Sequence, residues 1–294
     1  MNYRKRALTF DAQLAQLKDR GLSVRDEGQA LHWLANVSYY RLSAYSLPFR
    51  HDDRFHPGTD FSDIVDLYVF DRRLRLLLLD AIERIEVASR TAVTYEISHA
   101  LGAFGYADRS NFSPKFQHGR FLADVSKEEG RANETFVEHF RKKYTSEIHL
   151  PIWMVTELIS FGALSQLYAH LSPQLRSRVA VRYHVHESVF ANWLHALSYV
   201  RNVCAHHKRL WNRELAIRPM VPRNDRRWAR LSIDNTRLAA SLAVIAHLLQ
   251  CVAPGSEWAD RVAELFDAYP NVPRAAMGFK PGDDVRKVLG SFVS

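Results

Sequence analysis

Cysteine, apolar runs of membrane length and strand patterns are all scarce in this chain of 294 residues. Its two cysteines, Cys204 and Cys251, imply no disulfide framework and favour a reducing, cytoplasmic location. The most apolar segment, residues 238–253, is shorter than the roughly 18–20 residues of a membrane span, so we expect a buried helix there. The basic amino terminus lacks the apolar core of a signal peptide, which argues against secretion.

Alternation of apolar and polar residues, the pattern of a half-buried strand, reaches no useful length in the sequence. Glycine and proline are absent from residues 61–101, where apolar side chains recur every three or four positions and predict one long helix. We expect its charges, which include Asp71, Arg75, Glu86 and Arg90, to form a solvated face with ion pairs, the alternative being a nucleic-acid groove. The predicted fold class is all-α.

Loop-forming residues suggest how the chain is organised. Residues 46–60 are rich in Pro, Gly, Asp and His, which is typical of an exposed loop. We therefore expect a single all-helical domain with three parts, namely an N-terminal helical pair (about 1–55), a core (about 60–215) and a C-terminal helical extension (about 220–294).

Acidic residues are fewer than basic ones, 32 against 40, and the formal net charge is +8. This balance favours an anionic partner such as nucleic acid, although a modest positive charge also serves solubility.

Residues 193–213, WLHALSYVRNVCAHHKRLWNR, join an apolar helical stripe to a cluster of chemically active side chains. The spacing predicts a helix from near His186 to around Arg209. At about 100° per residue, Asn202 and His206 share one face of that helix, and Arg201 flanks them. An imidazole exchanges protons near neutral pH, a guanidinium neutralises phosphate, and an amide orients either group, so the cluster suits metal-free attack on RNA phosphate.

Each of these residues also has a structural interpretation. A histidine near a helix end is ordinarily a capping or packing residue. Glu157 either accepts a hydrogen bond from Arg201 or forms an ion pair on its own helix face. The basic residues after His206 either stabilise the negative end of the helix or bind RNA phosphates. These RNA-binding candidates are His207, Lys208, Arg209 and Arg213.

A metal site is not expected from this sequence. Zinc sites built from Cys and His usually show paired ligands at short spacing in two clusters. Here a single cysteine accompanies irregularly spaced histidines at 184, 186, 195, 206 and 207. We predict neither a metal nor a cofactor.

The run Arg-Asn-Val-Cys-Ala-His at 201–206 resembles the nuclease motif of the HEPN superfamily. The longer string RNVCAHHKRLWNR is similar to the signature of its abortive-infection (Abi) branch, of the AbiD/AbiF-like kind. Residues 37–49, 70–90 and 151–168 fit the same branch, so the resemblance covers most of residues 20–220.

The resemblance implies a helical bundle of HEPN type with N-terminal and C-terminal extensions. It also implies a metal-independent endoribonuclease for anti-phage abortive infection, with Arg201, Asn202 and His206 as catalytic residues and a 2′,3′-cyclic phosphate product. HEPN nucleases commonly form homodimers in which two motifs face each other, and members of the Abi branch have been linked to small noncoding RNAs. We therefore expect a homodimer with a composite site and a noncoding RNA as guide or antidote.

Two alternatives stay open at this point. The chain could be an RNA-binding or regulatory module in which the same basic motif binds RNA without cutting it. The chain could instead sense a phage protein through an apolar surface.

Overall fold

The computed structural model describes residues 6–222, 225–231 and 233–292. Helices make up 67% of the structure, and the described residues contain fourteen α-helices and one two-stranded hairpin, which confirms the predicted all-α class. Among these helices, none combines the length and the apolar character that crossing a membrane requires.

The first of two compact units comprises residues 1–75 and 264–272. Its first two helices begin after N-cap residues, since the Thr9 hydroxyl accepts from the Ala12 amide at 3.2 Å and the Asp26 carboxylate accepts from the Gln29 amide at 2.8 Å. The elements of this unit are α1 (Phe10–Asp19), α2 (Glu27–Val37), α3 (Tyr39–Ser46), η1 (Leu47–Phe49), β1 (Arg50–His51), β2 (Arg54–Phe55) and the beginning of α4 (Phe61–Leu101).

A buried polar cluster links α3 to α4 in this unit. The Tyr45 hydroxyl donates to Asp71 Oδ2 at 2.6 Å, and Arg75 Nη1 donates to the same carboxylate oxygen. Burial raises the pKa of Tyr45 far above its ordinary value, so the phenol stays protonated and keeps its role as donor. The expectation of a solvated charged face on α4 is therefore wrong for Asp71 and Arg75, whose charges are satisfied inside the unit.

Helix α4 has the predicted bounds and continues into the second unit, which comprises residues 76–263 and 273–294. The division of the chain into a helical pair, a core and an extension stays a prediction. The remaining elements of the second unit are η2 (Gly105–Ala107), η3 (Arg109–Asn111), α5 (His118–Arg131), α6 (Thr135–Lys143), α7 (Ile152–Leu158), α8 (Phe161–Ala169), α9 (Pro173–Ala180), η4 (Val181–Tyr183), α10 (Glu187–Ala205), α11 (Arg226–Arg230), α12 (Leu238–Val252), the beginning of α13 (Trp258–Ala268), η5 (Arg274–Met277) and α14 (Val285–Gly290).

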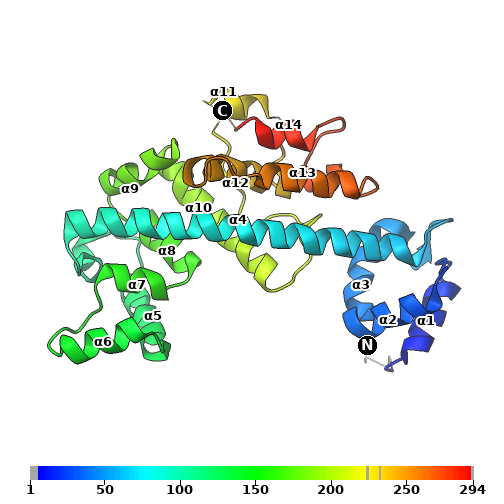
Figure 1. Ribbon diagram of the computed structural model, residues 1–294, viewed down its shortest axis with the longest axis horizontal. Coiled ribbons are helices and arrows are strands. Elements are labelled where there is room, and N and C mark those ends of the chain that lie inside the picture. Colours follow the sequence, from blue (N-terminus) through cyan, green and yellow to red (C-terminus); the bar gives the residue numbers. More distant parts are fainter. Residues whose placement is uncertain (1–5, 223–224, 232, 293–294) are drawn as a thin grey trace. The chain divides into compact units, whose positions relative to one another are not determined.

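Within the second unit, helices cover α4 from two sides (Figure 1). Helices α5 and α7 lie on one side, and α12 and α14 lie on the other. The apolar segment predicted to be a buried helix forms α12, whose residues from Leu238 to Leu249 are all buried. The Trp258 indole N–H donates to the Leu77 carbonyl at 2.8 Å and fixes the beginning of α13 against α4. Helix α10, which carries the predicted site, packs against α8, α9 and α12.

Candidate functional site

Helix α10 presents the motif at its carboxyl end. Its buried side chains, among them Trp193, Leu197 and Val200, pack it into the core at the three- and four-residue spacing that predicted the helix. Arg201 and Asn202 lie in the last full turn, where the Arg201 side chain is 43% exposed and Asn202 is exposed. The motif thus sits where a rigid, buried helix reaches the surface.

The helix ends at Ala205, four residues before the predicted end. His206 is the C-cap, and its amide still donates to the Asn202 carbonyl at 3.0 Å. His207 then adopts the left-handed conformation (φ 53°), and the amides of His207 and Lys208 donate to the carbonyls of Cys204 and Val203, each at 3.0 Å. This is the Schellman arrangement, which closes a helix and usually places glycine where His207 stands.

The early end changes the position of the predicted RNA-binding residues. Lys208, Arg209 and Arg213 follow the helix instead of forming its last turn, so the expected basic helix end is wrong in its geometry. Lys208 is exposed, whereas Arg209 and Arg213 are half-buried, and Arg213 Nε donates to the Arg209 carbonyl at 2.8 Å. The four candidates, His207 included, lie between residues 207 and 213, in the segment that directly follows His206 and that we name the basic turn.

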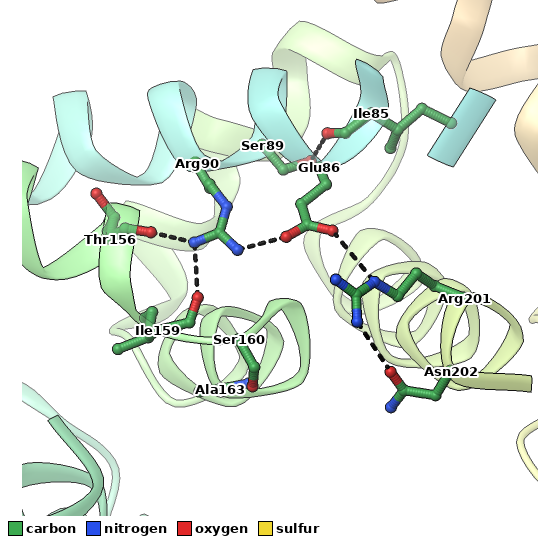
Figure 2. Close-up of polar contacts among 10 residues, drawn as sticks. All are labelled: Ile85, Glu86, Ser89, Arg90, Thr156, Ile159, Ser160, Ala163, Arg201 and Asn202. Atoms are coloured by element: carbon green, nitrogen blue, oxygen red, sulfur yellow. Dashed lines mark hydrogen bonds and ion pairs between the residues drawn. The ribbon is translucent and has the colours of Figure 1, made fainter. Parts of the chain in front are cut away.

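His206 and Arg201 both reach solvent at this end of α10, which is the condition their proposed roles require. The His206 amide donates to the Asn202 carbonyl, which keeps His206 and Asn202 one helical turn apart, as the spacing predicted. Asn202 Oδ1 accepts from Arg201 Nη1 at 3.4 Å, so this amide contacts the guanidinium. The sequence suggests that this amide orients the imidazole or the guanidinium, and the structure shows a contact with Arg201 (Figure 2).

Glu86 of α4 is the acidic partner of Arg201. Its Oε2 lies 4.0 Å from Arg201 Nε, while its Oε1 accepts from Arg90 Nη2 on the next turn of α4. Figure 2 shows the two guanidinium groups approaching this one carboxylate from opposite sides. The Glu86 and Arg90 side chains are 13% and 12% exposed, so solvent screens their pair weakly, whereas the Arg201 guanidinium beside the same carboxylate stays in contact with solvent.

Arg90 connects the same carboxylate to α7. Its Nη1 donates to the Thr156 carbonyl and, at 2.9 Å, to the Ile159 carbonyl at the end of α7 (Figure 2). The Thr94 and Thr156 hydroxyls lie 2.8 Å apart and add a second link between the two helices. Helices α4, α7 and α10 are therefore joined through Glu86 and Arg90, and Arg201 is the member of this network that reaches furthest into solvent.

Sequence reasoning missed the importance of Glu86 and Arg90. They were expected on a solvated face, yet their side chains are 13% and 12% exposed. The exposed Glu157, considered as a partner of Arg201, is not part of this network. One signal was present: Glu86 falls at helical spacing between the buried Ile82 and Ser89, on the face that packs inward.

The site can do two things chemically. With two guanidinium groups around one carboxylate, the network has a net positive charge that favours a phosphate next to Arg201. The neighbouring imidazole belongs to the side-chain type best suited to moving a proton near neutral pH. Within the described ranges, no three His, Cys, Asp or Glu side chains gather in a way that could hold a metal ion.

Fold and site together define an all-helical protein with an exposed Arg-His motif anchored by a carboxylate from a second helix. The family described as Abi-like protein matches the chain over residues 32–212, which is more than half of its length, and the chain belongs to this family. No curated protein and no solved structure matches it. Membership connects the chain with abortive infection, and the matched span contains Glu86, Arg201 and His206.

Proposed function

We propose that this protein is a metal-independent endoribonuclease of HEPN type that acts in abortive infection. The observation that carries the proposal is that an exposed His206 and an Arg201 lying beside Glu86 both reach the surface at the end of a buried helix, five residues apart. Membership of the Abi-like family and the resemblance of residues 201–206 to the HEPN nuclease motif support it. The net charge of +8 is compatible with an RNA substrate.

In the proposed reaction, the ribose 2′-oxygen attacks the adjacent phosphorus. The 2′-hydroxyl proton goes to a base, the bond from phosphorus to the 5′-oxygen breaks, and that oxygen takes a proton from an acid. The products are a 2′,3′-cyclic phosphate and a 5′-hydroxyl. Arg201 neutralises the charge that builds up on the phosphoryl oxygens, and His206 moves a proton. DNA lacks the attacking hydroxyl and is not a substrate.

A reaction that needs both an acid and a base is served by two histidines, and the motif supplies only His206. We propose that two copies of the chain place their motifs face to face, so that Arg201 and His206 of each copy complete one site. A noncoding RNA that acts as guide or antidote restrains this activity. RNA that copurifies at low salt and is released at high salt is the expected sign of such a partner.

Cleavage of RNA in EDTA, followed by analysis of the new ends, tests the proposal. Wild-type protein should leave 2′,3′-cyclic phosphates, and His206→Ala should abolish cleavage while its circular dichroism and melting temperature stay unchanged. His195→Ala is the matched control, because His195 is exposed on the same helix further from its end. Undiminished cleavage by His206→Ala would refute the assignment. RNA binding without cleavage, lost only when the basic turn is neutralised, would instead indicate a non-catalytic RNA-binding module.

A further inference from the structure

A polar cleft lies beside the junction of α7 and α8, in the same unit as the candidate site. Its volume is about 470 Å³, within the range of roughly 300–1,000 Å³ that is typical of ligand sites. One wall consists of residues 115–124, which lead into and begin α5, and the other is a face of α8 together with its N-cap. The polar side chains that line the cleft include Lys115, Arg120, Asp124, Ser160, Gln166 and His170.

The charges around this cleft are mainly positive. Lys115 and Arg120 are both exposed, and neither forms an ion pair with a described residue, whereas Asp124 is the one acidic side chain of the lining. Burial lowers the pKa of His170, and the positive charges of Arg176, Arg109 and Lys115 lower it further. Burial is the largest of these influences, and the three cations add a positive potential at His170 that an anion would relieve.

The two walls are fixed to each other, so the cleft is already formed without a ligand. The Ser113 amide donates to the His170 carbonyl at 2.9 Å, and the Ser113 hydroxyl lies 2.9 Å from His170 Nδ1. The Phe116 ring stacks on the His170 ring with 5.1 Å between centroids. A cleft held open in this way loses little conformational entropy when a ligand enters.

The cleft adjoins the candidate site through the beginning of α8. Ile159, whose carbonyl accepts from Arg90, is followed directly by Ser160, which lines the cleft and caps α8 by accepting from the Ala163 amide at 3.2 Å. Figure 2 shows Ser160 and Ala163 next to the network of Arg90, Glu86 and Arg201. The positive end of α8 adds to the attraction of Lys115 and Arg120 for an anion. Ser160 therefore connects the lining of the cleft to the residue that holds Arg90.

We propose that this cleft binds the phosphates of the RNA strand next to the position that is cut, with Lys115 and Arg120 as the phosphate contacts. The inference rests on the proposed function and assigns it a substrate-binding subsite. Single-stranded RNA is the favoured ligand because the cleft is open and carries several separate polar groups, which suits a flexible strand of repeated phosphates. Gln166, exposed on the α8 wall, supplies an amide for a ribose or a base.

Binding of a fluorescein-labelled, single-stranded RNA of mixed sequence, measured by anisotropy in the non-cleaving His206→Ala background, tests the proposal. Lys115→Ala combined with Arg120→Ala should raise the Kd at least tenfold. The slope of log K against log salt should fall by about 1.4, since each lost phosphate contact on a single strand contributes about 0.7. Asp124→Asn should bind the RNA more tightly than the parent.

The matched control is Lys127→Ala combined with Lys142→Ala, which removes the same charge from exposed positions on α5 and α6 outside the cleft. It should change the Kd by less than twofold. Equal loss of binding in the cleft and control variants, or no loss in either, overturns the proposal, as does a failure of the parent to bind RNA. If RNA binding depends on the cleft but the wild type cuts no RNA, the nuclease function is refuted and the RNA-binding cleft is not. If the wild type cuts RNA and the cleft variant binds RNA normally, the subsite is refuted and the nuclease function is not.

Discussion

Glu86 determines how Arg201 is held, although the two residues are far apart in the sequence. Its carboxylate lies 4.0 Å from Arg201 Nε and also accepts from Arg90, and it is mostly shielded from solvent. Arg201 has a flexible side chain that would lose entropy on ordering around a phosphate, and a fixed carboxylate reduces that loss. Glu86 is therefore a positioning residue in the proposed reaction.

We predict that Glu86→Gln lowers the kcat of RNA cleavage by about tenfold to a hundredfold, because a misplaced guanidinium stabilises the transition state poorly. The KM should change little, since most phosphate contacts remain. Kinetics on a defined RNA measures both constants. Glu83→Gln is the control, being exposed on the same helix one turn away, and should behave as wild type. Equal effects of the two substitutions would contradict a positioning role for Glu86.

The buried His247 makes the stability of the second unit depend on pH. Burial lowers its pKa below the ordinary 6.5, its Nε2 donates to the Tyr183 carbonyl at 2.9 Å, and its Nδ1 is buried with no partner among the described residues. The unfolded chain therefore binds a proton at a higher pH than the folded protein does. Stability from this group is complete above the unfolded pKa and decreases as the pH falls below it.

We predict that the free energy of unfolding falls between pH 7.5 and pH 5.5, with His247 contributing up to about 1.4 kcal/mol per pH unit below pH 6.5. Urea denaturation at several pH values measures this slope. His247→Gln keeps a donor for Tyr183 and should make the slope shallower, with a remainder from His170, whose pKa is also lowered. A slope that is identical in wild type and His247→Gln would show that His247 does not titrate on unfolding.

Among the individual residues, the sequence allowed the positions of Arg201, Asn202 and His206 to be predicted, because a helix fixes which neighbours share a turn. Glu86 could not be found in this way. Its i, i+4 spacing to Arg90 is the same as that of Asp80 to Arg84, a far more exposed pair, and only the tertiary packing buries one of the two pairs. Helix packing, and not local spacing in the sequence, determines which carboxylate lies beside Arg201.

Several helices begin where a residue with a capping side chain is present. Thr9, Asp26 and Ser172 are residue types that favour helix N-caps and they cap helices here, and α4 has its predicted bounds. The predictions failed where the chain turns without glycine. His207 takes a left-handed conformation and ends α10 early, and Ser38 (φ 74°) separates α2 from α3. A positive φ is uncommon at both histidine and serine, so these two helix ends could not be predicted from the residue types.

Ser38 provides a test of backbone strain at the junction of α2 and α3. Its φ of 74° and ψ of 144° lie in a region that L-residues seldom adopt, and its hydroxyl accepts from the Arg41 amide at 3.3 Å. We predict that Ser38→Gly raises the free energy of unfolding by about 1 kcal/mol, since the relief of about 1–3 kcal/mol of strain exceeds the loss of the cap and the greater freedom of the unfolded chain.

Ser38→Ala is the matched comparison for this substitution. It removes the capping hydroxyl and keeps the strained conformation, so it should lower the free energy of unfolding by about 1 kcal/mol. Urea denaturation of the three proteins gives the order glycine, serine, alanine from most to least stable. A glycine variant no more stable than wild type would mean that the backbone at Ser38 carries no strain.

At the scale of the whole molecule, the proposed reaction requires two copies of the chain. One chain supplies a single His206 at the end of α10, and a composite site needs the histidine of each copy. If both are required, a mixed dimer of wild type and His206→Ala is inactive. With equal amounts and random pairing, about one quarter of the dimers are fully wild type, whereas independent sites would keep about one half of the activity.

We therefore predict that coexpression of equal amounts of wild type and His206→Ala leaves about one quarter of the specific activity of wild type. Native mass spectrometry gives the fractions of the three dimers in the same sample, so the measured activity is compared with the measured pairing. The same mixture made with His195→Ala should keep full activity, because His195 is exposed away from the motif. Activity near one half would show that each copy cuts independently, and a fully active monomer would remove the need for a composite site.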